Sequence, residues 1–312
     1  MKSMIKSLVA AFMLVTGVAA NAAQDIQIYT ADNSKGKITG ASIEKAFADA
    51  GFSISGNNDM NVAFKSKFQK TNHKMYHLFT LYKKDLVLEL VKVSPKAALF
   101  APLSMSIYMN KGSNDISISS LAIDGMSKVT GIPVSNKHMI EYSKLVRDTL
   151  AKALPNGHFE KTSYKIATPK GELITSFTGE MEAQGDDVED ELEGFQTELE
   201  GSLETAGFVI AGYNKLGDEF SAAGYDKYDF FDAYSICKLP VIFEVAKTHP
   251  EAGAFAPCTL YMYKEKGSTV VEMAYPSVYN WISSLDIEDK PSIKVLEDAQ
   301  KRMVKVINEV TE

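Results

Sequence analysis

The chain has 312 residues, of which 45% are hydrophobic and 10% aromatic, and its formal net charge is −7. This composition is typical of a globular protein and excludes a disordered chain, and the length predicts two domains at roughly 100–200 residues each. The acidic balance disfavours nucleic-acid binding, because a negatively charged surface repels phosphate backbones.

The N-terminal segment has the pattern of a secretory signal peptide. Lys2 and Lys6 precede an apolar run that ends near Ala20, and the sequence Ala20-Asn21-Ala22 places small residues before a cleavage site. The apolar run is too short for a membrane span, which needs ~20 residues. We therefore expect residues 1–22 to be cleaved, leaving a mature net charge of −9 (31 basic against 40 acidic residues). The mature protein would be soluble and periplasmic, without membrane insertion; an uncleaved N-terminal anchor is the alternative.

The sequence that follows predicts a strand, a helix and a group of strands closed by a longer helix. Residues 26–30 favour a strand, and Ile43 and Phe47 lie on one face of a helix that Gly51 ends. The other elements expected here are a strand at 74–82, a short helix at 85–93 stopped by Pro95, two strands joined by the turn at 111–113, and a helix at about 136–153.

The middle of the chain is expected to connect two domains. Residues 161–179 have the pattern of a hairpin that turns at Pro169-Lys170-Gly171. Between Gly171 and Asn214 there are twelve acidic residues and no Lys or Arg. We interpret this acidic stretch as the solvated face of a helix, in preference to an acidic binding surface.

The second part of the chain predicts the same elements again. Those expected are an amphipathic helix at 188–206 ended by Gly207, a strand at 228–237, a short helix at 239–247 stopped by Pro250, two strands around the turn at 266–268, and a helix at 291–310. The triplet Phe100-Ala101-Pro102 recurs as Phe255-Ala256-Pro257, 155 residues later, and the Lys-Gly-Ser turns have the same offset. A period this long indicates a duplicated domain, because solenoid repeats span only ~20–50 residues.

These patterns predict an α+β fold of two homologous two-layer domains. Each domain would be a strand–helix–four-strand–helix unit. We place the first repeat domain, which has no cysteine, at residues 23–158, and the hairpin connection with the second, cysteine-containing domain at residues 159–312. Two homologous units in one chain can pack with pseudo-two-fold symmetry, as an intramolecular pseudo-dimer.

Cys237 and Cys258, the only cysteines, are the first candidate site. One ends a predicted strand and the other begins one, so the two are expected to be spatial neighbours. An even number of cysteines in an exported protein favours a disulfide bridge, which would stabilise the fold by ~3 kcal/mol. The alternative is a functional thiol pair that handles redox chemistry, sulfur species or a soft metal such as copper.

His73, Met75 and His77 are the second candidate site, because alternate residues of a strand share one face. Imidazole and thioether ligands suit copper, but no fourth ligand is visible in the sequence, so we predict no metal site here. The sequence contains none of the usual catalytic or cofactor-binding signatures, and we predict no catalytic residue and no cofactor.

The segment 234–273 resembles the bacterial domain-of-unknown-function family numbered 302. The positions that carry the resemblance are Cys237, Pro250, Pro257, Cys258, Tyr263 and Gly267, whereas Ala256 departs from the Leu of the family. The first part of the chain resembles a degenerate copy, with Tyr82 and Leu103 in place of the two cysteines. The resemblance covers roughly residues 26–153 and 174–312. It implies a tandem-repeat member with a fold similar to the TATA-binding-protein class, and it implies no reaction.

The sequence therefore predicts an exported, non-enzymatic binding or accessory protein. Its partner would be a small ligand or another periplasmic protein, of a kind that the sequence does not name. The alternative function is a thiol-dependent redox, sulfur-handling or copper protein that uses Cys237 and Cys258.

Overall fold

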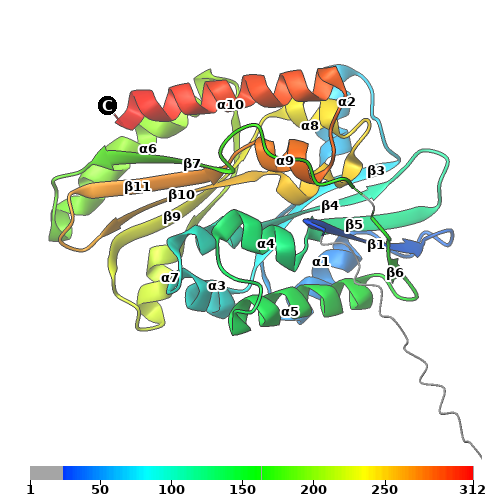
Figure 1. Cartoon of the computed structure of the whole chain (residues 1–312), viewed down its shortest axis with the longest axis horizontal. Coiled ribbons are helices and arrows are strands. Elements are labelled where there is room, and N and C mark those ends of the chain that lie inside the picture. The colour runs from blue at the N-terminus through cyan, green and yellow to red at the C-terminus, as the bar shows by residue number, and fades with distance from the viewer. Residues whose placement is uncertain (1–23, 163, 312) are drawn as a thin grey trace, which may run out of the picture.

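The computed structural model describes residues 24–162 and 164–311, so the predicted signal peptide lies outside the described residues. Two antiparallel sheets occupy the middle of the molecule, and helices cover them on both sides (Figure 1). The predicted α+β class is confirmed.

The first half of the molecule contains one sheet and its helices. In chain order its elements are β1 (Ile26–Asp32), α1 (Gly40–Asp49), β2 (Ser53–Asp59), α2 (Met60–Phe68), β3 (Met75–Tyr82), α3 (Lys84–Val91), the 3-10 helix η1 (Pro95–Phe100), β4 (Leu103–Met109), β5 (Asp115–Leu121), α4 (Ile123–Thr130), α5 (Lys137–Ala153) and β6 (His158–Phe159).

The second half contains the other sheet, and its elements follow one another in nearly the same way. They are β7 (Ile174–Glu180), the 3-10 helix η2 (Gly185–Asp187), α6 (Val188–Thr205), β8 (Val209–Lys215), α7 (Leu216–Ala222), β9 (Tyr228–Cys237), α8 (Leu239–Val245), the 3-10 helix η3 (Pro250–Phe255), β10 (Cys258–Glu265), β11 (Val270–Pro276), α9 (Tyr279–Ser284) and α10 (Lys290–Thr311).

The two sheets have the same strand order. The first runs β2-β3-β4-β5-β1 and adds β6 at its edge, and the second runs β8-β9-β10-β11-β7. The register also agrees, because Ile107 pairs with Ile118 in the first sheet and Met262 pairs with Met273 in the second, each 155 residues later. Each edge pair carries a register shift, at Ile54/Gly56 and at Ile210/Gly212.

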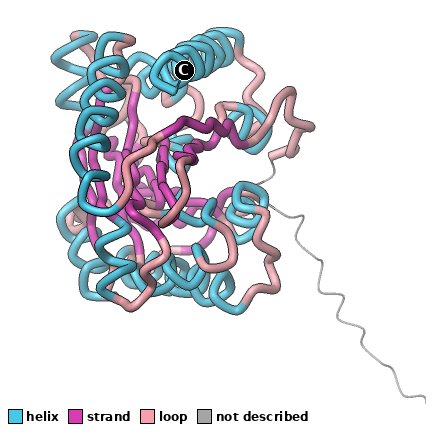
Figure 2. The backbone as a smooth tube through the Cα atoms, turned by 90° about the vertical axis from the view of Figure 1, so that its left-hand side faces the viewer, coloured by secondary structure: helices cyan, strands magenta, loops and turns pink. Residues whose placement is uncertain are grey.

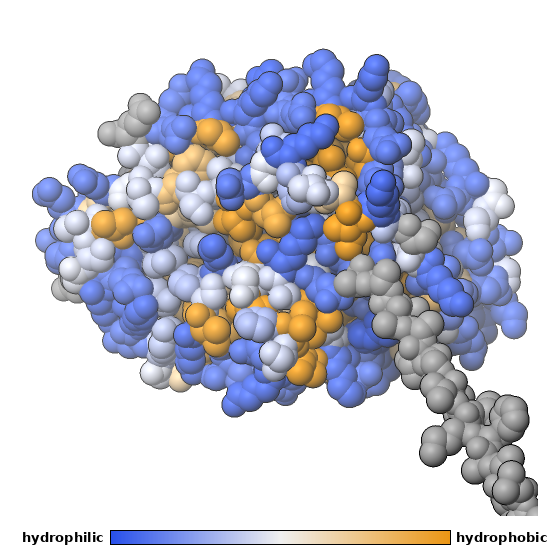
Figure 3. All heavy atoms as spheres, viewed as in Figure 1, coloured by the Kyte–Doolittle hydropathy of each residue, from blue (hydrophilic) through white to orange (hydrophobic). Residues whose placement is uncertain are grey.

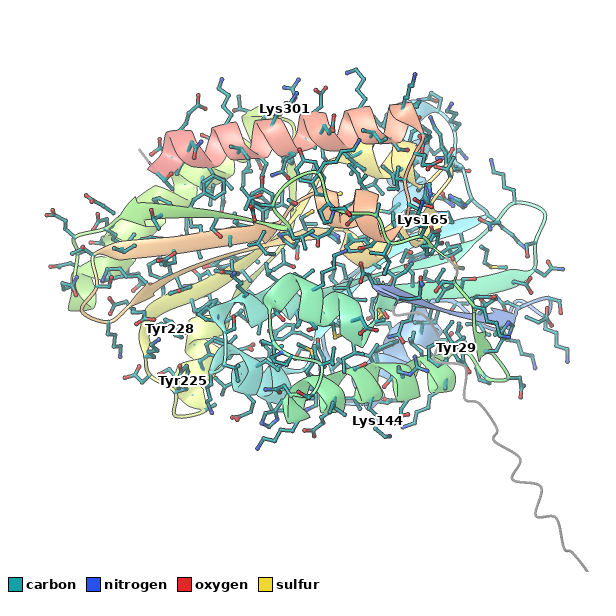
Figure 4. All side chains as sticks on the ribbon, viewed as in Figure 1. Tyr29, Lys144, Lys165, Tyr225, Tyr228 and Lys301 are labelled. Atoms are coloured by element: carbon teal, nitrogen blue, oxygen red, sulfur yellow. The ribbon has the colours of Figure 1, made fainter. Side chains whose placement is uncertain are left out.

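The outer face of each sheet is covered by its first and last long helices. In the first half Phe47 of α1 packs its ring edge-on against Phe79 of β3. In the turned view of Figure 2 the strands run between helices above and below them. The terminal helices α5 and α10 are hydrophilic along their outward edges (Figure 3), and Lys144 and Lys301 point away from the sheets (Figure 4). Both helices are therefore amphipathic, as the spacing of their apolar residues predicts.

The inner faces meet through the two 3-10 helices that precede β4 and β10. The helix η3 of the second half packs on β4 and β5 of the first, and η1 packs on β10 and β11. Ser106 and Ser119, both fully buried, donate hydrogen bonds to the carbonyl oxygens of Pro250 and Glu251. Gly253 lies so close to β4 that a Cβ atom there would stand 2.4 Å from the Cβ of Ser106.

Two further hydrogen bonds cross between the halves in a reciprocal way. Ser104 Oγ donates to the carbonyl of Pro257 at 2.8 Å, and Thr259 Oγ1 donates to the carbonyl of Pro102 at 3.0 Å. Ser104 and Thr259 are 155 residues apart, as are Pro102 and Pro257. Each half therefore makes the same contact to the other.

The hairpin predicted over 161–179 is not formed. The described residues between Phe159 and Ile174 contain no strand, and β7 pairs with β11 along its whole length. The connecting segment instead runs from one half to the other, where the amide of Ala167 donates to the carbonyl of Ser283. A seven-residue partner in the main sheet offers more backbone hydrogen bonds than a local hairpin, so β7 pairs there.

Candidate functional site

Cys237 and Cys258 lie at the ends of neighbouring strands. Cys237 is the last residue of β9 and Cys258 the first of β10, where it pairs with Ile236. Both are free thiols, so the disulfide bridge that the cysteine count favours is not formed in the structure. Both thiols instead line one cavity of about 50 Å³, which we call the thiol pocket.

The thiol pocket lies on the outer side of the second sheet, between the strand ends and α8, α9 and α10. Its walls are mostly apolar, and the residues that line it are Phe208, Ile236, Cys237, Lys238, Val241, Ile242, Ala256, Cys258, Tyr275, Pro276, Val278, Trp281, Leu296, Ala299, Gln300 and Met303. Gln300 is already engaged, because its Nε2 donates to Thr175 at 2.8 Å. The indole Nε1 of Trp281 is buried and has no hydrogen-bond partner among the described residues.

The apolar surroundings keep the two thiols neutral. Burial raises the pKa of Cys237 to about 12, with a smaller contribution from the neighbouring Cys258 thiol, and burial also raises the pKa of Cys258 to about 12. A thiol is a nucleophile only as its thiolate, so neither cysteine is activated for attack at neutral pH.

Lys238 is the only basic residue among those that line the thiol pocket. It follows Cys237 directly, and its Nζ donates to the carbonyl of Ala206 at 2.6 Å and stands 4.4 Å from the ring centre of Phe208. The pKa of Lys238 is lowered, chiefly by partial burial and next by Arg302.

At the corresponding place in the first half, larger side chains stand where the two cysteines line the thiol pocket in the second. Tyr82 stands at the position of Cys237, and its hydroxyl donates to Glu219 Oε1 in the second half at 2.8 Å. Leu103 stands at the position of Cys258 and is fully buried. Tyr142 of α5 packs against Phe52 and Phe100, the counterparts of Phe208 and Phe255. The helix α10 contains no aromatic residue, so nothing on it takes the place of Tyr142.

The second candidate set does not form a site. His73 precedes β3, and its ring nitrogens lie 3.0 Å from Asn110 Oδ1 and 2.6 Å from the carbonyl oxygen of Ala246. The Nδ1 of His77 lies 2.8 Å from Asn57 Oδ1. These nitrogens are taken up by protein contacts, and no group of three or more His, Cys, Asp or Glu side chains in the described residues is placed to hold a metal ion.

Sequence reasoning missed most of the pocket wall. Lys238 lies between β9 and α8, Trp281 on α9, and Ala299 and Met303 on α10, and no motif links them. One signal was present in the sequence: the last helix of the first half carries an aromatic residue, Tyr142, that the last helix of the second half does not match.

Arg147 of α5 and Arg302 of α10 lie 155 residues apart in the sequence but do not occupy equivalent surroundings. Arg147 donates to Gln27 and stacks on Phe159, whereas Arg302 lies in a surface groove between α6 and α10.

Comparison with known proteins finds a family match in the half of the chain that contains the thiol pocket. The model of the family described as "Domain of unknown function DUF302" matches residues 187–310, so a DUF302 domain occupies α6 to α10 and contains both cysteines. A solved structure, titled as that of an uncharacterized conserved protein DUF302 from Bacillus stearothermophilus, aligns with 44% of this chain and 98% of its own chain. Its sequence identity is 18% and its TM-score is 0.36.

No curated protein matches the chain. None of the helices that the structure describes combines the length and the apolar composition needed to cross a membrane.

Proposed function

We propose that this protein is an exported, non-enzymatic binding or accessory protein whose ligand site is the thiol pocket. One observation carries the proposal: the only two cysteines of the chain line the same small apolar cavity without forming a bridge. Export rests on the N-terminal sequence, with Lys2 and Lys6, the short apolar run and the small residues before Ala23.

Binding is favoured over thiol catalysis by the state of the thiols. A dithiol catalyst needs an attacking thiolate, which proteins obtain by lowering a cysteine pKa near cations or a helix N-terminus. Here burial raises the pKa of both cysteines to about 12. Two cysteines beside one apolar cavity suit a ligand that is held through sulfur contacts and apolar walls, and a metal ion bound there would displace the thiol protons.

We further propose that the first half is a degenerate second copy of the DUF302 domain, with boundaries at residues 23–158 and 159–312. The shared strand order, the matching registers and the edge register shifts support this. The reciprocal hydrogen bonds of Ser104 and Thr259 support a pseudo-two-fold packing of the copies. In this arrangement one copy provides the binding site and the other supports it.

The test is to recover the protein from the periplasm of its native host and to measure its mass under nondenaturing and denaturing conditions. We expect a mature chain that begins at Ala23 and carries a small additional mass, which denaturation releases. Substitution Ala299→Phe narrows the pocket and should remove that mass, whereas Ala222→Phe, at an exposed position of α7, should retain it. A bare chain from the host, or equal retention by both variants, would overturn the proposed site; an intact Met1 would overturn export by cleavage.

A further inference from the structure

We propose that the thiol pocket is a Cu(I) site in which the sulfur atoms of Cys237 and Cys258 bind the ion and the thioether of Met303 completes the set. The inference rests on the proposed function, because it names the ligand class of the same pocket. It is carried by the donor atoms, the size and the charge of that pocket.

The donor atoms of the pocket are soft. Cys237, Cys258 and Met303 all line it, and its wall contains no carboxylate and no imidazole. Thiolate and thioether ligands select Cu(I), whereas carboxylate and imidazole ligands suit harder or borderline ions. Cu(I) is held well by two thiolates with a third, weaker sulfur ligand such as a thioether.

The size of the pocket restricts what can occupy it. Its volume is about 50 Å³. Pockets for organic ligands usually measure ~300–1,000 Å³, whereas about 10–15 Å³ of such volume already holds one water molecule. A single ion or a very small molecule fits the space, and an organic cofactor does not.

The charges in the pocket balance with a monovalent ion. Two thiolates and one Cu(I) carry a net charge of −1, and the ammonium of Lys238 on the same wall supplies +1. A divalent ion with two thiolates and this ammonium would leave a net charge of +1 beside the apolar walls, which is less favourable than a neutral set. The pairing of two thiols with one lysine therefore favours Cu(I) over Zn²⁺.

Binding involves no electron transfer. Each thiol loses its S–H proton to the buffer, two Cu–S bonds form, and copper remains in the +1 state throughout. The first half cannot repeat this chemistry, because Tyr82 and Leu103 stand in place of the cysteines and Tyr142 fills the space. The stoichiometry should therefore be one Cu(I) per chain.

The test is an anaerobic titration of the reduced mature chain with Cu(I), held in competition with a chromophoric Cu(I) chelator. We expect the protein to withdraw one equivalent of Cu(I) and to develop thiolate-to-copper absorption in the ultraviolet. Trp281 is the only tryptophan of the chain and lines the pocket, so its fluorescence should be quenched with the same endpoint.

Variants separate a pocket site from nonspecific thiol binding. Cys237→Ser and Cys258→Ser should each abolish the absorption band and the quenching, with circular dichroism to check the fold. Ala299→Phe keeps both thiols but narrows the cavity, and it should also abolish binding. Met303→Leu should weaken the affinity by about tenfold, whereas Met273→Leu, in a buried strand position outside the pocket, should leave it unchanged.

The outcomes distinguish this inference from the proposed function. The Cu(I) site is overturned if the chain fails to compete for Cu(I), if binding survives in Ala299→Phe, or if Met303→Leu and Met273→Leu behave alike. The chain could fail to bind Cu(I) while protein recovered from the host still carries an additional mass that Ala299→Phe removes. In that case the pocket binds another small ligand and the proposed function stands.

Discussion

Asp232 is a buried carboxyl group on the outer face of the second sheet. Its side chain is 3% exposed, and its Oδ2 accepts hydrogen bonds from Tyr213 Oη at 2.8 Å and from Gln196 Nε2 at 2.9 Å. Burial raises the pKa of Asp232 to about 6, against the opposing effect of these two hydrogen bonds. The desolvation of the charged form therefore outweighs the hydrogen bonds that stabilise it.

This pKa shift predicts a loss of stability between pH 5 and pH 7. Because the folded-state pKa is raised above its unfolded value, the folded protein binds more protons than the unfolded chain in this window, and the free energy of unfolding falls as pH rises through 6. The contribution of Asp232 should fall by about 1 kcal/mol from pH 5 to pH 7.

Urea denaturation of the wild type and of Asp232→Asn at the two pH values measures this contribution. The variant should lack that part of the pH dependence and gain stability relative to the wild type as pH rises. Parallel pH profiles for the two proteins would contradict the prediction.

At the scale of residues, the sequence identified both cysteines but not the state in which they occur. The number of cysteines and the predicted export favour a bridge. Both indicate only that the compartment is oxidising, and neither indicates how the two side chains are placed. The free thiols result from the placement of Cys237 and Cys258 in an apolar cavity shared with α10. Trp281 and Met303 carry no recognisable pattern, because they reach the cysteines only after α9 and α10 fold back on the sheet.

At the scale of elements, apolar spacing and glycine stops located the long helices. The helices predicted at 136–153 and 188–206 are observed as α5 and α6, and Gly207 has the positive φ of 80° expected after a helix. These features are local, since a helical face and its cap depend on residues a few positions apart. The hairpin predicted at 161–179 does not form, because β7 pairs with β11, which lies far along the sequence.

The terminal helices differ in the side chains that they place beside the strand ends. Tyr142 is fully buried on α5, and its hydroxyl donates to the carbonyl of Phe100 at 3.3 Å. Substitution Tyr142→Ala should open a cavity in the first half and lower the free energy of unfolding by about 3–5 kcal/mol. Chemical denaturation measures the change.

Tyr142→Phe is the matched control, because it keeps the ring and removes only the hydroxyl. It should cost about 0.5–1.5 kcal/mol, the usual contribution of one hydrogen bond. Equal losses for the two variants would mean that the hydrogen bond, and not the volume of the ring, stabilises this position.

At the scale of the whole molecule, the two halves are joined by a close backbone approach. A Cβ added at Gly253 of η3 would stand 2.4 Å from the Cβ of Ser106 and 3.0 Å from Leu78 of the first sheet. Substitution Gly253→Ala should therefore force the halves apart and destabilise the protein by about 1–3 kcal/mol. Because the buried contact couples both sheets, calorimetry should show one cooperative transition that moves as a whole in the variant.

Gly194→Ala is the control for Gly253→Ala. Gly194 lies within α6, and an added Cβ meets nothing within 4 Å. This change should stabilise the protein by up to about 1 kcal/mol, because alanine is the better helix former. Two separate transitions, with only one displaced by Gly253→Ala, would show that the halves unfold independently.

Three features follow from the amino-acid sequence alone: the α+β class, the positions of the long helices and the correspondence between the Phe-Ala-Pro triplets. Each depends on the spacing of residues within one element or on a repeated string, and both are visible in one dimension. The serines of β4 and β5 belong to no motif in the sequence. In the structure, Ser106 and Ser119 donate hydrogen bonds to carbonyl groups of η3 and so join the two halves.

The position of the thiol pocket depends on how distant elements pack against one another. The same strand ends occur in both halves, but Tyr82, Leu103 and Tyr142 fill the space in the first, whereas Cys237, Cys258 and the non-aromatic helix α10 leave it open in the second. A cavity is the volume that remains after several distant elements have packed together, so its size depends on all of them at once. The sequence specifies the residues of each pocket wall, but the space between the walls is defined only by the packing of the folded elements.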